Sequence, residues 1–529
     1  MSKIENQTIS SPYIDRRVAE GIFRELLNER PTYRVFNIYG KSGSGKSAFV
    51  EHIKDKYLKN RDFISVNLNF NDRLLHKPQK AIMHIAKELE QNYGFNFLAL
   101  WKAYAILWHK RYEHSPIMYA ADLPYFEEIK KIFNPKSNNK NIISIAKGIF
   151  GNKLSKELES LKQLDTKSIE DKIYKFFAAD LRRIVKESKY KDCVIILENV
   201  DRLKEYNNSS PCSKDSWIRD LITQVGKDAL FLISAKEQLN WQQCNSSWKM
   251  SIREYEMKNF TKKDSLKYLT HSGINDNNLK DAIVISASNE PFWLSLATVS
   301  YTKNYKKLPT NKLDILKAFY KTNEDSLGDL LKILVHSRFF TKELIDTIQD
   351  KFNISATPYI IDKLLTMPFI KKLDKKRYII DDAFIEKTLE LQSQKEIVEY
   401  KAFMFSYYEN ILQTLDEELV KATPQLVDEA IEEAWYYLNN INNEPLVHFE
   451  WLDYYIDRFF MYAAWEPFLE RYSKIVPQLK KSEDKVSKNK LVALYNNLAG
   501  LYESLGDTKI SKKYYDLVIN LNRPELLSA

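Results

Sequence analysis

The chain has 529 residues, of which 44% are hydrophobic and 13% aromatic, which excludes a disordered chain. That length is enough for roughly three or four domains. The formal net charge of +9 comes from 80 basic and 71 acidic residues that are interspersed, which permits nucleic-acid binding without implying it.

Residues 1–10 lack the apolar core of a signal peptide. Residues 95–108 are apolar but are interrupted by Lys102 and are too short to cross a bilayer, so we expect a cytoplasmic protein without a membrane span.

The cysteine content is low. Cys193, Cys212 and Cys244 are the only three. Their spacing matches no metal-ligand pattern, and an odd number does not form an even disulfide framework. We therefore expect a protein of a reducing compartment.

The strongest motif lies at residues 40–47, Gly-Lys-Ser-Gly-Ser-Gly-Lys-Ser. It follows an apolar run at 33–39 and precedes a helical pattern that starts at Ala48, which is the strand, glycine loop and helix of a P-loop. The glycines allow a tight turn that aims backbone N–H groups at phosphates, and the helix adds its positive N-terminal end. The motif therefore predicts binding of a nucleoside triphosphate, with the expected ligands Gly40, Ser42, Gly43, Ser44, Gly45, Lys46 and Ser47.

Specific chemical roles follow for two of these residues and for a second motif. Lys46 is expected to reach the β- and γ-phosphates, and the Ser47 hydroxyl to hold Mg²⁺. Residues 193–203 form an apolar run that ends in charge, typical of a buried parallel strand whose carboxyl end faces a ligand. Glu198 would face Mg²⁺ through a water, and Asp201 would orient or deprotonate the attacking water. The alternative is an ordinary strand that ends in surface charge.

Two basic residues are candidate phosphate or nucleotide contacts. Lys236 follows a predicted strand at 230–234, where a basic side chain commonly senses the γ-phosphate. Arg16 lies just before the first strand, and a nucleotide contact and a solvated helix start are equally compatible with its spacing.

The other predicted elements surround these motifs. Residues 63–70 alternate as a strand does, and 79–92 show the pattern of an amphipathic helix. Residues 95–190 form an aromatic-rich helical insertion whose aromatic stripe is expected to pack in a core, and which contains a short apolar helix at 142–150.

The order of these parts resembles that of the STAND class of P-loop ATPases, which includes the NLR immune receptors and their bacterial relatives. The resemblance covers residues 11–395 and implies a role for each motif. Asp15 stands where the class usually has Gly, Glu198 replaces Asp, Lys236 replaces Arg, and Asn289 replaces Gly but also tolerates a positive φ. The matching segments are 13–17 before the first strand, the Walker A loop at 40–47, the Walker B strand at 195–198, the sensor strand at 231–236, and 289–297, in which Pro291 would pack near the adenine.

Residues 325–392 have the pattern of a winged helix, with three helices and a hairpin. By itself such a module predicts DNA binding, whereas in STAND proteins it packs on the nucleotide domain and holds the resting state. The wing ends at Asp381, where the class has a histidine that contacts the ADP β-phosphate. Because an acid facing a diphosphate would repel it, we expect the ADP lock to be weak or built differently.

Beyond residue 396 the chain is helical, and its last unit matches one tetratricopeptide repeat. Less regular helix pairs precede it, at 398–415 with 424–441 and at 449–463 with 466–480. A single repeat cannot bury its own faces, so it needs these neighbours or a partner. The alternative is a plain helical bundle. The residues that carry the repeat pattern are Tyr495, Leu498, Ala499, Gly500, Tyr502, Gly506, Asp507, Ser511, Tyr515, Val518 and Pro524.

We therefore expect an α/β P-loop domain with a parallel sheet, followed by all-α parts. The expected domains are 1–255 for the nucleotide-binding domain, 256–315 for a small helical domain, 316–395 for the winged helix and 396–529 for helices that resemble tetratricopeptide repeats.

The resemblance implies a switch that uses ATP/ADP and Mg²⁺, hydrolyses ATP slowly, forms a homo-oligomer on activation and acts through a separate effector protein. Its C-terminal helices would bind a protein trigger, and related bacterial proteins serve in defence against phage. Two alternatives stay open. One is a DNA-binding winged-helix regulator or initiator-like ATPase, and the other is a nucleotide-bound adaptor that does not hydrolyse.

Overall fold

The computed structural model divides into two compact units, Met1–Asn96 with Phe177–Ile397 and Phe97–Phe176 with Val398–Ala529. It describes residues 13–522 except for 15, 30, 60–61, 112–155, 206–211, 213, 302–306, 324–325, 418–423, 461–464 and 482–484. The predicted helix at 142–150, the substitution at Asp15 and the repeat position Pro524 lie outside the described residues.

The first unit is built on a five-stranded parallel sheet in the order β2-β3-β4-β1-β5. Four strands agree closely with the sequence prediction, and β5 was not predicted. The strands are β1 (Arg34–Tyr39), β2 (Phe63–Asn69), β3 (Asp192–Glu198), β4 (Leu230–Ala235) and β5 (Ile252–Glu256).

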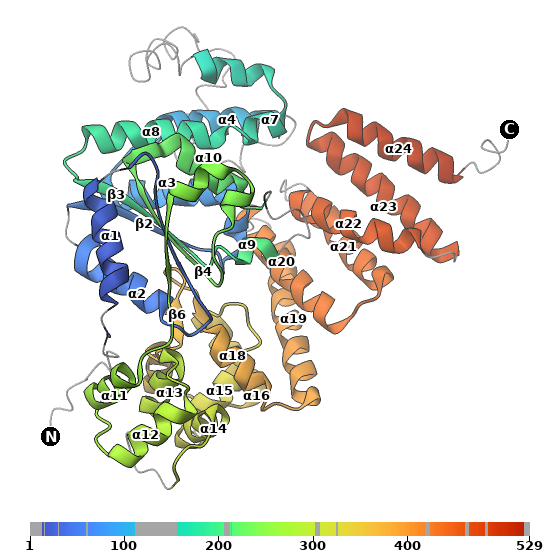
Figure 1. Ribbon diagram of the computed structural model, residues 1–529. Coiled ribbons are helices and arrows are strands. Elements are labelled where there is room, and N and C mark those ends of the chain that lie inside the picture. Colours follow the sequence, from blue (N-terminus) through green and yellow to red (C-terminus); the bar gives the residue numbers. More distant parts are fainter. Residues whose placement is uncertain are drawn as a thin grey trace. The chain divides into compact units, whose positions relative to one another are not determined.

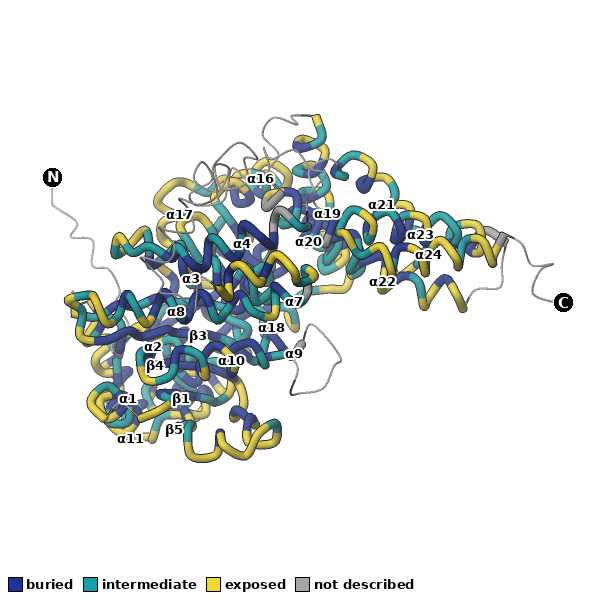
Figure 2. Tube along the Cα trace, turned by 90° about the horizontal axis from the view of Figure 1, so that it is seen from above, coloured by how far each residue is buried: buried dark blue, intermediate teal, exposed yellow. Residues whose placement is uncertain are grey.

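The centre of this sheet is buried on both faces, as a parallel sheet requires when its crossover connections are helical. Every residue of β3 and β4 is buried, and Figure 2 shows these strands in the buried colour. On one face Phe23, Phe36 and Phe49 join a single apolar cluster with β3 and β4. The helices around the sheet are α1 (Arg17–Glu29), α2 (Lys46–Ile53), α3 (Pro78–Tyr93), α8 (Ile173–Glu187), α9 (Arg202–Glu205) and α10 (Ser216–Val225), and Figure 1 shows α1 and α2 on the face opposite α3 and α10.

A buried ion pair ties the amino edge of the sheet together. Arg34 at the start of β1 donates to Asp192 at the start of β3 at 2.7 Å, and its Nε donates to the Leu26 carbonyl at 2.9 Å. Asp192 also accepts from the backbone N–H of Cys193 at 2.8 Å. This charge pair is therefore fully buried and well supplied with hydrogen bonds.

The cysteine pattern predicted no even disulfide framework and a reducing compartment, yet the structure contains a disulfide. Cys212 and Cys244 are bonded, with their Cα atoms 5.6 Å apart, while Cys193 is a buried free thiol on β3. Asp215 ties the two cysteine segments together, because it pairs with Arg219 and accepts from Trp241 Nε1 at 2.6 Å. Sequence spacing could not show this pairing, since 32 residues separate the cysteines and only tertiary packing brings them together.

The remainder of the first unit is mostly helical. After a group of four helices comes a segment that we call the hairpin module, residues 326–389, which has three helices, an antiparallel two-stranded hairpin and a final helix. Phe369 stacks on Phe384 at 4.0 Å, and Phe319 contacts both rings edge-on. This aromatic cluster fixes the hairpin and the final helix against the preceding helices. The elements are α11 (Lys262–His271), α12 (Asn277–Ser286), α13 (Pro291–Tyr301), α14 (Lys312–Thr322), α15 (Ser326–Leu334), α16 (Lys342–Phe352), α17 (Pro358–Leu365), β6 (Ile370–Lys372), β7 (Tyr378–Ile380) and α18 (Asp382–Leu389).

The described part of the second unit consists of helices and the turns that connect them. Tyr408 and Tyr437 stack in its core, and the last two helices pack on each other across a turn at Gly506, whose φ is +78°. No helix among the described residues is long and apolar enough to cross a membrane. The principal helices are α4 (Leu98–Arg111), α7 (Thr166–Glu170), α19 (Gln394–Glu417), α20 (Pro424–Ile441), α21 (Pro445–Phe459), α22 (Trp465–Lys480), α23 (Lys485–Ser504) and α24 (Thr508–Asn522).

Candidate nucleotide-binding site

The glycine loop joins β1 to α2 at the carboxyl edge of the sheet. Gly43 and Gly45 have φ values of +76° and +96°, which side chains rarely adopt. A Cβ on Gly43 would lie 2.7 Å from the Cβ of Phe292, whose backbone N–H donates to the Gly43 carbonyl at 3.1 Å. The glycines therefore serve both the turn and the close approach of α13.

Lys46 is held inside this loop. Its side chain is buried, and its ammonium donates to the carbonyls of Gly40 at 2.6 Å and Lys41 at 2.9 Å. Burial lowers the pKa of Lys46 to about 8, against the opposing attraction of Asp201. A phosphate group beside the ammonium would favour its charged form again.

The two predicted acids lie at the carboxyl end of β3, and β4 separates this strand from β1. Glu198 is buried and accepts from Asn67 Nδ2 at 2.9 Å. Asp201 accepts from the Lys236 backbone N–H through Oδ1 at 2.8 Å, while its buried Oδ2 has no hydrogen-bond partner in the described part of the chain. The sheet thus brings the acids to the edge that carries the glycine loop, as the sequence predicts.

Several features of this edge fit a nucleoside phosphate with its metal ion. The hydroxyl of Ser44 is buried and, like Asp201 Oδ2, has no partner among the described residues. Unpaired buried polar atoms are costly and usually meet a ligand or water. The Ser44 hydroxyl, the left-handed glycines and the buried ammonium of Lys46 form a cradle suited to an anion, whereas the Asp201 oxygen suits a water or a metal ion.

Arg16 and Pro291 also contact the loop. Arg16 donates to the carbonyls of Ser44 at 3.3 Å and Lys258 at 2.9 Å, so it is not a merely solvated residue at a helix start. Pro291 begins α13 and lies beside Gly45, 3.9 Å from where a Cβ would be. Asn289, two residues before Pro291, has φ +57°, the conformation that glycine would otherwise supply.

The hairpin module reaches the same loop through two side chains that carry opposite charge. Lys371 on β6 donates to the Ser47 hydroxyl at 3.1 Å and to Asp381 at 3.0 Å. Asp381 also accepts from the Ser42 hydroxyl at 3.4 Å and from the Ala383 N–H at 3.0 Å, which caps α18. Figure 1 shows β6 near the glycine-loop end of the sheet.

The prediction that Asp381 would repel a diphosphate did not take Lys371 into account. Burial by itself would raise the pKa of Asp381, but the Lys371 ammonium and the Ala383 N–H lower it. Burial conversely opposes the charge on Lys371, while Asp381, Glu198 and Asp382 raise its pKa. The pair is therefore ionised on both sides and presents a cation, not only an acid, to the loop.

Further ion pairs join the hairpin module to the sheet domain. Arg202 Nη2 donates to both carboxylate oxygens of Asp382, at 2.6 and 2.5 Å, and Lys236 lies 3.1 Å from the same carboxylate. Arg377 pairs with Asp72 at 2.5 Å. The predicted sensor Lys236 thus faces the module in this arrangement.

The sequence prediction missed the partners Lys371, Arg377 and Asp382. The only local signal was the Asp381-Asp382 doublet at the end of the predicted hairpin. In β6, Lys371 lies on the face opposite to Ile370 and Lys372, because side chains alternate along a strand.

A match to a family model supports the fold of this domain. Residues 18–210 match the KAP family P-loop domain, and no curated protein matches the chain. Among solved structures, the chain is similar to a STAND protein with a tetratricopeptide repeat sensor from Pyrococcus horikoshii, at 14% identity and a TM-score of 0.43. That match covers 97% of this chain and 65% of the other.

Two other solved structures match with lower TM-scores. A Walker-type ATPase of Pyrococcus abyssi matches at 12% identity and a TM-score of 0.34, over 71% of this chain and 96% of that one. The Orc1 protein of Aeropyrum pernix, solved in complex with DNA, matches at 11% identity and a TM-score of 0.32, over 73% and 95%. The family match, the parallel sheet and the glycine loop together identify residues 18–210 as part of a P-loop NTPase domain similar to that of the KAP family, a domain type that binds nucleotides.

Proposed function

We propose that this protein is an ATP-dependent molecular switch in which the hairpin module, a winged helix, closes over the nucleotide site in the resting state. The observation that carries this proposal is the contact of Lys371 and Asp381 with Ser47 and Ser42. A module bonded to the loop that holds the phosphates responds directly to what the loop binds. Nucleotide state and module position are therefore coupled.

The glycine-loop residues would hold the phosphate chain of ATP or ADP, with Lys46 as the main charge contact. Arg16 and Pro291 would border the nucleotide. Mg²⁺ held by Ser47 and Glu198 would neutralise charge on the phosphates. Asp201, with one oxygen committed to the Lys236 N–H and the other unpaired, is suited to orient a water and to support slow hydrolysis that resets the switch.

The ion pairs of the module suit a reversible contact. The side chains of Arg202, Lys236 and Asp382 are 27%, 40% and 36% exposed. Pairs of this kind contribute about 0.2–1 kcal/mol each because water competes for both partners. A few such contacts hold a closed state that a ligand with differential affinity can release.

The C-terminal helices would recognise a protein trigger, and their contact would favour ATP over ADP and self-association. Their aromatic content and the repeat-like pair α23 and α24 support a role as a protein-binding surface. The output would pass through a separate effector protein, with antiphage defence as the biological setting in which such switches act. We also propose a cytoplasmic location, as the sequence analysis predicts.

The two alternatives differ in what they require. A DNA-binding regulator would need a basic third helix, yet α17 carries one lysine and one aspartate, and its Lys363 donates to Asn323 at 2.7 Å. Salt-dependent binding to generic duplex DNA tests that function. An adaptor that does not hydrolyse would show bound nucleotide but no turnover of radiolabelled ATP.

The decisive experiment measures the nucleotide content and the solution mass of the protein as purified, for the wild type and Lys46→Ala. We expect ADP on a monomer, loss of the ADP in the variant, and a larger mass after exchange into ATP. Wild-type protein that neither carries nor binds adenine nucleotide contradicts the proposed function. Bound nucleotide with no change of mass leaves a nucleotide-binding protein that is not an assembly switch.

A further inference from the structure

The position of the Lys371 ammonium relative to the P-loop is unusual. Its Nζ lies 3.1 Å from the hydroxyl of Ser47, the side chain that a P-loop of this spacing uses as its Mg²⁺ ligand. A hydroxyl oxygen that accepts from an ammonium has turned its lone pair toward that ammonium. A metal ion bound to the same oxygen would lie close to this ammonium and be repelled by it, so the two cations compete for Ser47.

The acids around the lysine reinforce this competition. Asp381 binds the ammonium directly at 3.0 Å, and Glu198 and Asp382 attract it. Glu198 is also the predicted acid that faces Mg²⁺. The Lys371 ammonium therefore lies among the groups that are expected to bind Mg²⁺.

We propose that Lys371 and Mg²⁺ are alternative cations at Ser47, so that the closed hairpin module holds a nucleoside diphosphate without Mg²⁺ and Mg²⁺–nucleotide displaces the module. The inference rests on the proposed function, because it assumes that the loop binds nucleotide. It deepens that function by naming the group that links the metal to the module. No covalent step is involved, and the exchange is one of ligands.

Replacing the charge of Lys371 on an otherwise unchanged strand tests the proposal. The variants are Lys371→Met and, as a matched control, Lys372→Met at the exposed next residue of β6. Lys371→Arg keeps the positive charge. It therefore shows whether an effect of Lys371→Met comes from the lost charge or from a change in packing. The probe is a fluorescent methylanthraniloyl-ADP, titrated into full-length protein with Mg²⁺ and again with EDTA.

We expect wild-type affinity for this probe to change by less than about threefold when Mg²⁺ is chelated, because the ammonium replaces the metal charge. Lys371→Met should lose about tenfold or more of its affinity in EDTA and recover most of it with Mg²⁺, since the positive charge that takes the place of the metal is removed. Lys372→Met should behave as the wild type. Lys371→Arg should stay less dependent on Mg²⁺ than Lys371→Met.

A second readout follows the module itself. Amide hydrogen exchange of residues 370–380 should rise in the wild type when Mg²⁺ and ATP are added, and should be high in Lys371→Met with or without them.

Equal Mg²⁺ dependence in the wild type and Lys371→Met, or equal losses in the Lys371 and Lys372 variants, would overturn the inference while leaving nucleotide binding intact. Absence of probe binding by the wild type under both conditions would overturn the proposed function instead. The two failures are therefore distinguishable.

Discussion

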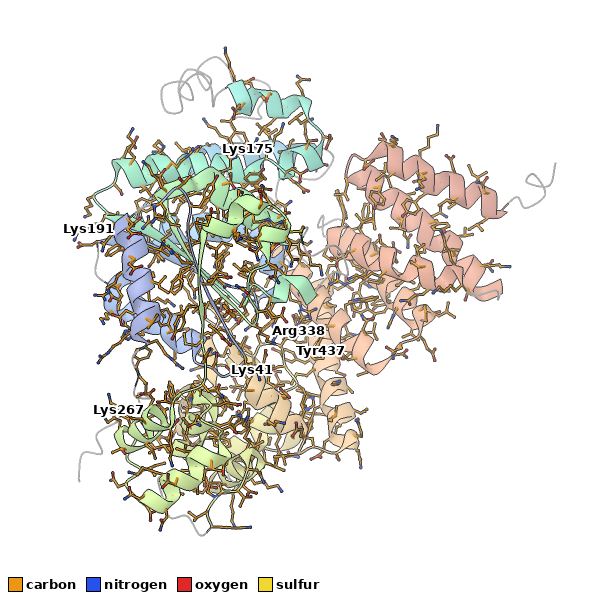
Figure 3. The ribbon with its side chains drawn as sticks, in the orientation of Figure 1. Lys41, Lys175, Lys191, Lys267, Arg338 and Tyr437 are labelled. Atoms are coloured by element: carbon orange, nitrogen blue, oxygen red, sulfur yellow. A yellow bond between two sulfur atoms is a disulfide. The ribbon has the colours of Figure 1, made fainter. Side chains whose placement is uncertain are left out.

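The two edges of the central sheet each carry an ion pair, and the pairs differ in how completely they are satisfied. At the amino edge Arg34 and Asp192 are buried, and both have further backbone partners. At the carboxyl edge Lys371 is half-buried and shares its ammonium between Asp381 and a loop hydroxyl. Figure 3 labels Lys191, next to the first pair, and Lys41, next to the second, at opposite ends of the sheet.

This difference separates a structural pair from an exchangeable one. A buried pair with every hydrogen bond made gains nothing from a new ligand and loses much when one partner is removed. At the other edge the unpaired oxygens of Asp201 and Ser44 leave bonding capacity for a ligand. The carboxyl edge is therefore the place where a bound ligand can add hydrogen bonds to polar groups of the sheet domain.

The largest expected effect comes from breaking the amino-edge pair. Asp192→Ala leaves the Arg34 guanidinium buried without its carboxylate and should lower the free energy of unfolding by about 3–5 kcal/mol. The measurement is the urea unfolding midpoint, followed by tryptophan fluorescence.

The matched control is Asp62→Ala, which removes the neighbouring exposed pair of Asp62 with Lys191. That change should cost about 0–1 kcal/mol because water already solvates both charges. Similar losses in the two variants would show that burial does not distinguish the pairs.

The next largest effect concerns the glycine loop. Gly43→Ala places a Cβ at φ +76° and against Phe292, which should cost about 1–3 kcal/mol and weaken nucleotide binding. Isothermal titration with ADP and thermal unfolding measure the two effects. Gly21→Ala on α1 meets nothing within 4 Å and should be neutral or stabilising, so equal losses in both variants would contradict a specific role for the loop.

The third effect is a pH dependence that comes from Lys46. Its pKa in the folded protein is about 8, below the ordinary 10.5, so between these values the unfolded chain holds more protons. The contribution of Lys46 to the free energy of unfolding of the nucleotide-free protein therefore rises with pH between about 8 and 10.5. Nucleotide affinity should do the opposite and fall above pH 8, by at most about tenfold per pH unit for one proton.

Calorimetric titration with ADP in two buffers of different ionisation heat, near pH 8.5, measures the proton uptake directly. The uptake should disappear in Lys46→Arg, whose charge does not titrate in this range. Proton release on binding in the wild type would contradict the assignment.

The smallest effect tests the release of the module. Asp382→Asn weakens the pairs with Arg202 and Lys236, and should destabilise the closed arrangement by about 1 kcal/mol. That corresponds to roughly a fivefold shift of the closed-to-open equilibrium. Hydrogen exchange of residues 370–389 measures it, and Glu386→Gln on the exposed face of α18 is the control with the same charge change.

Several parts of the site were predictable because their signals are local. The glycine loop occupies eight consecutive residues, and its spacing alone indicates the turn and the positions of Lys46 and Ser47. The apolar run before Glu198 likewise predicts a buried strand that ends in acids. β5 was missed because its sequence, Ile-Arg-Glu-Tyr-Glu, alternates with charge and its residues are only partly buried.

By itself the sequence determined the sheet domain and the loop, since periodicity and glycine spacing act over short stretches of chain. Only the tertiary structure decided which groups meet that loop. Lys371 is 324 residues away from Ser47, and the disulfide joins cysteines whose spacing matches no framework. Asp381 looks repulsive when read alone and becomes half of a neutral pair once Lys371 lies beside it, because the pKa and the reach of a charged side chain depend on neighbours that chain order does not reveal.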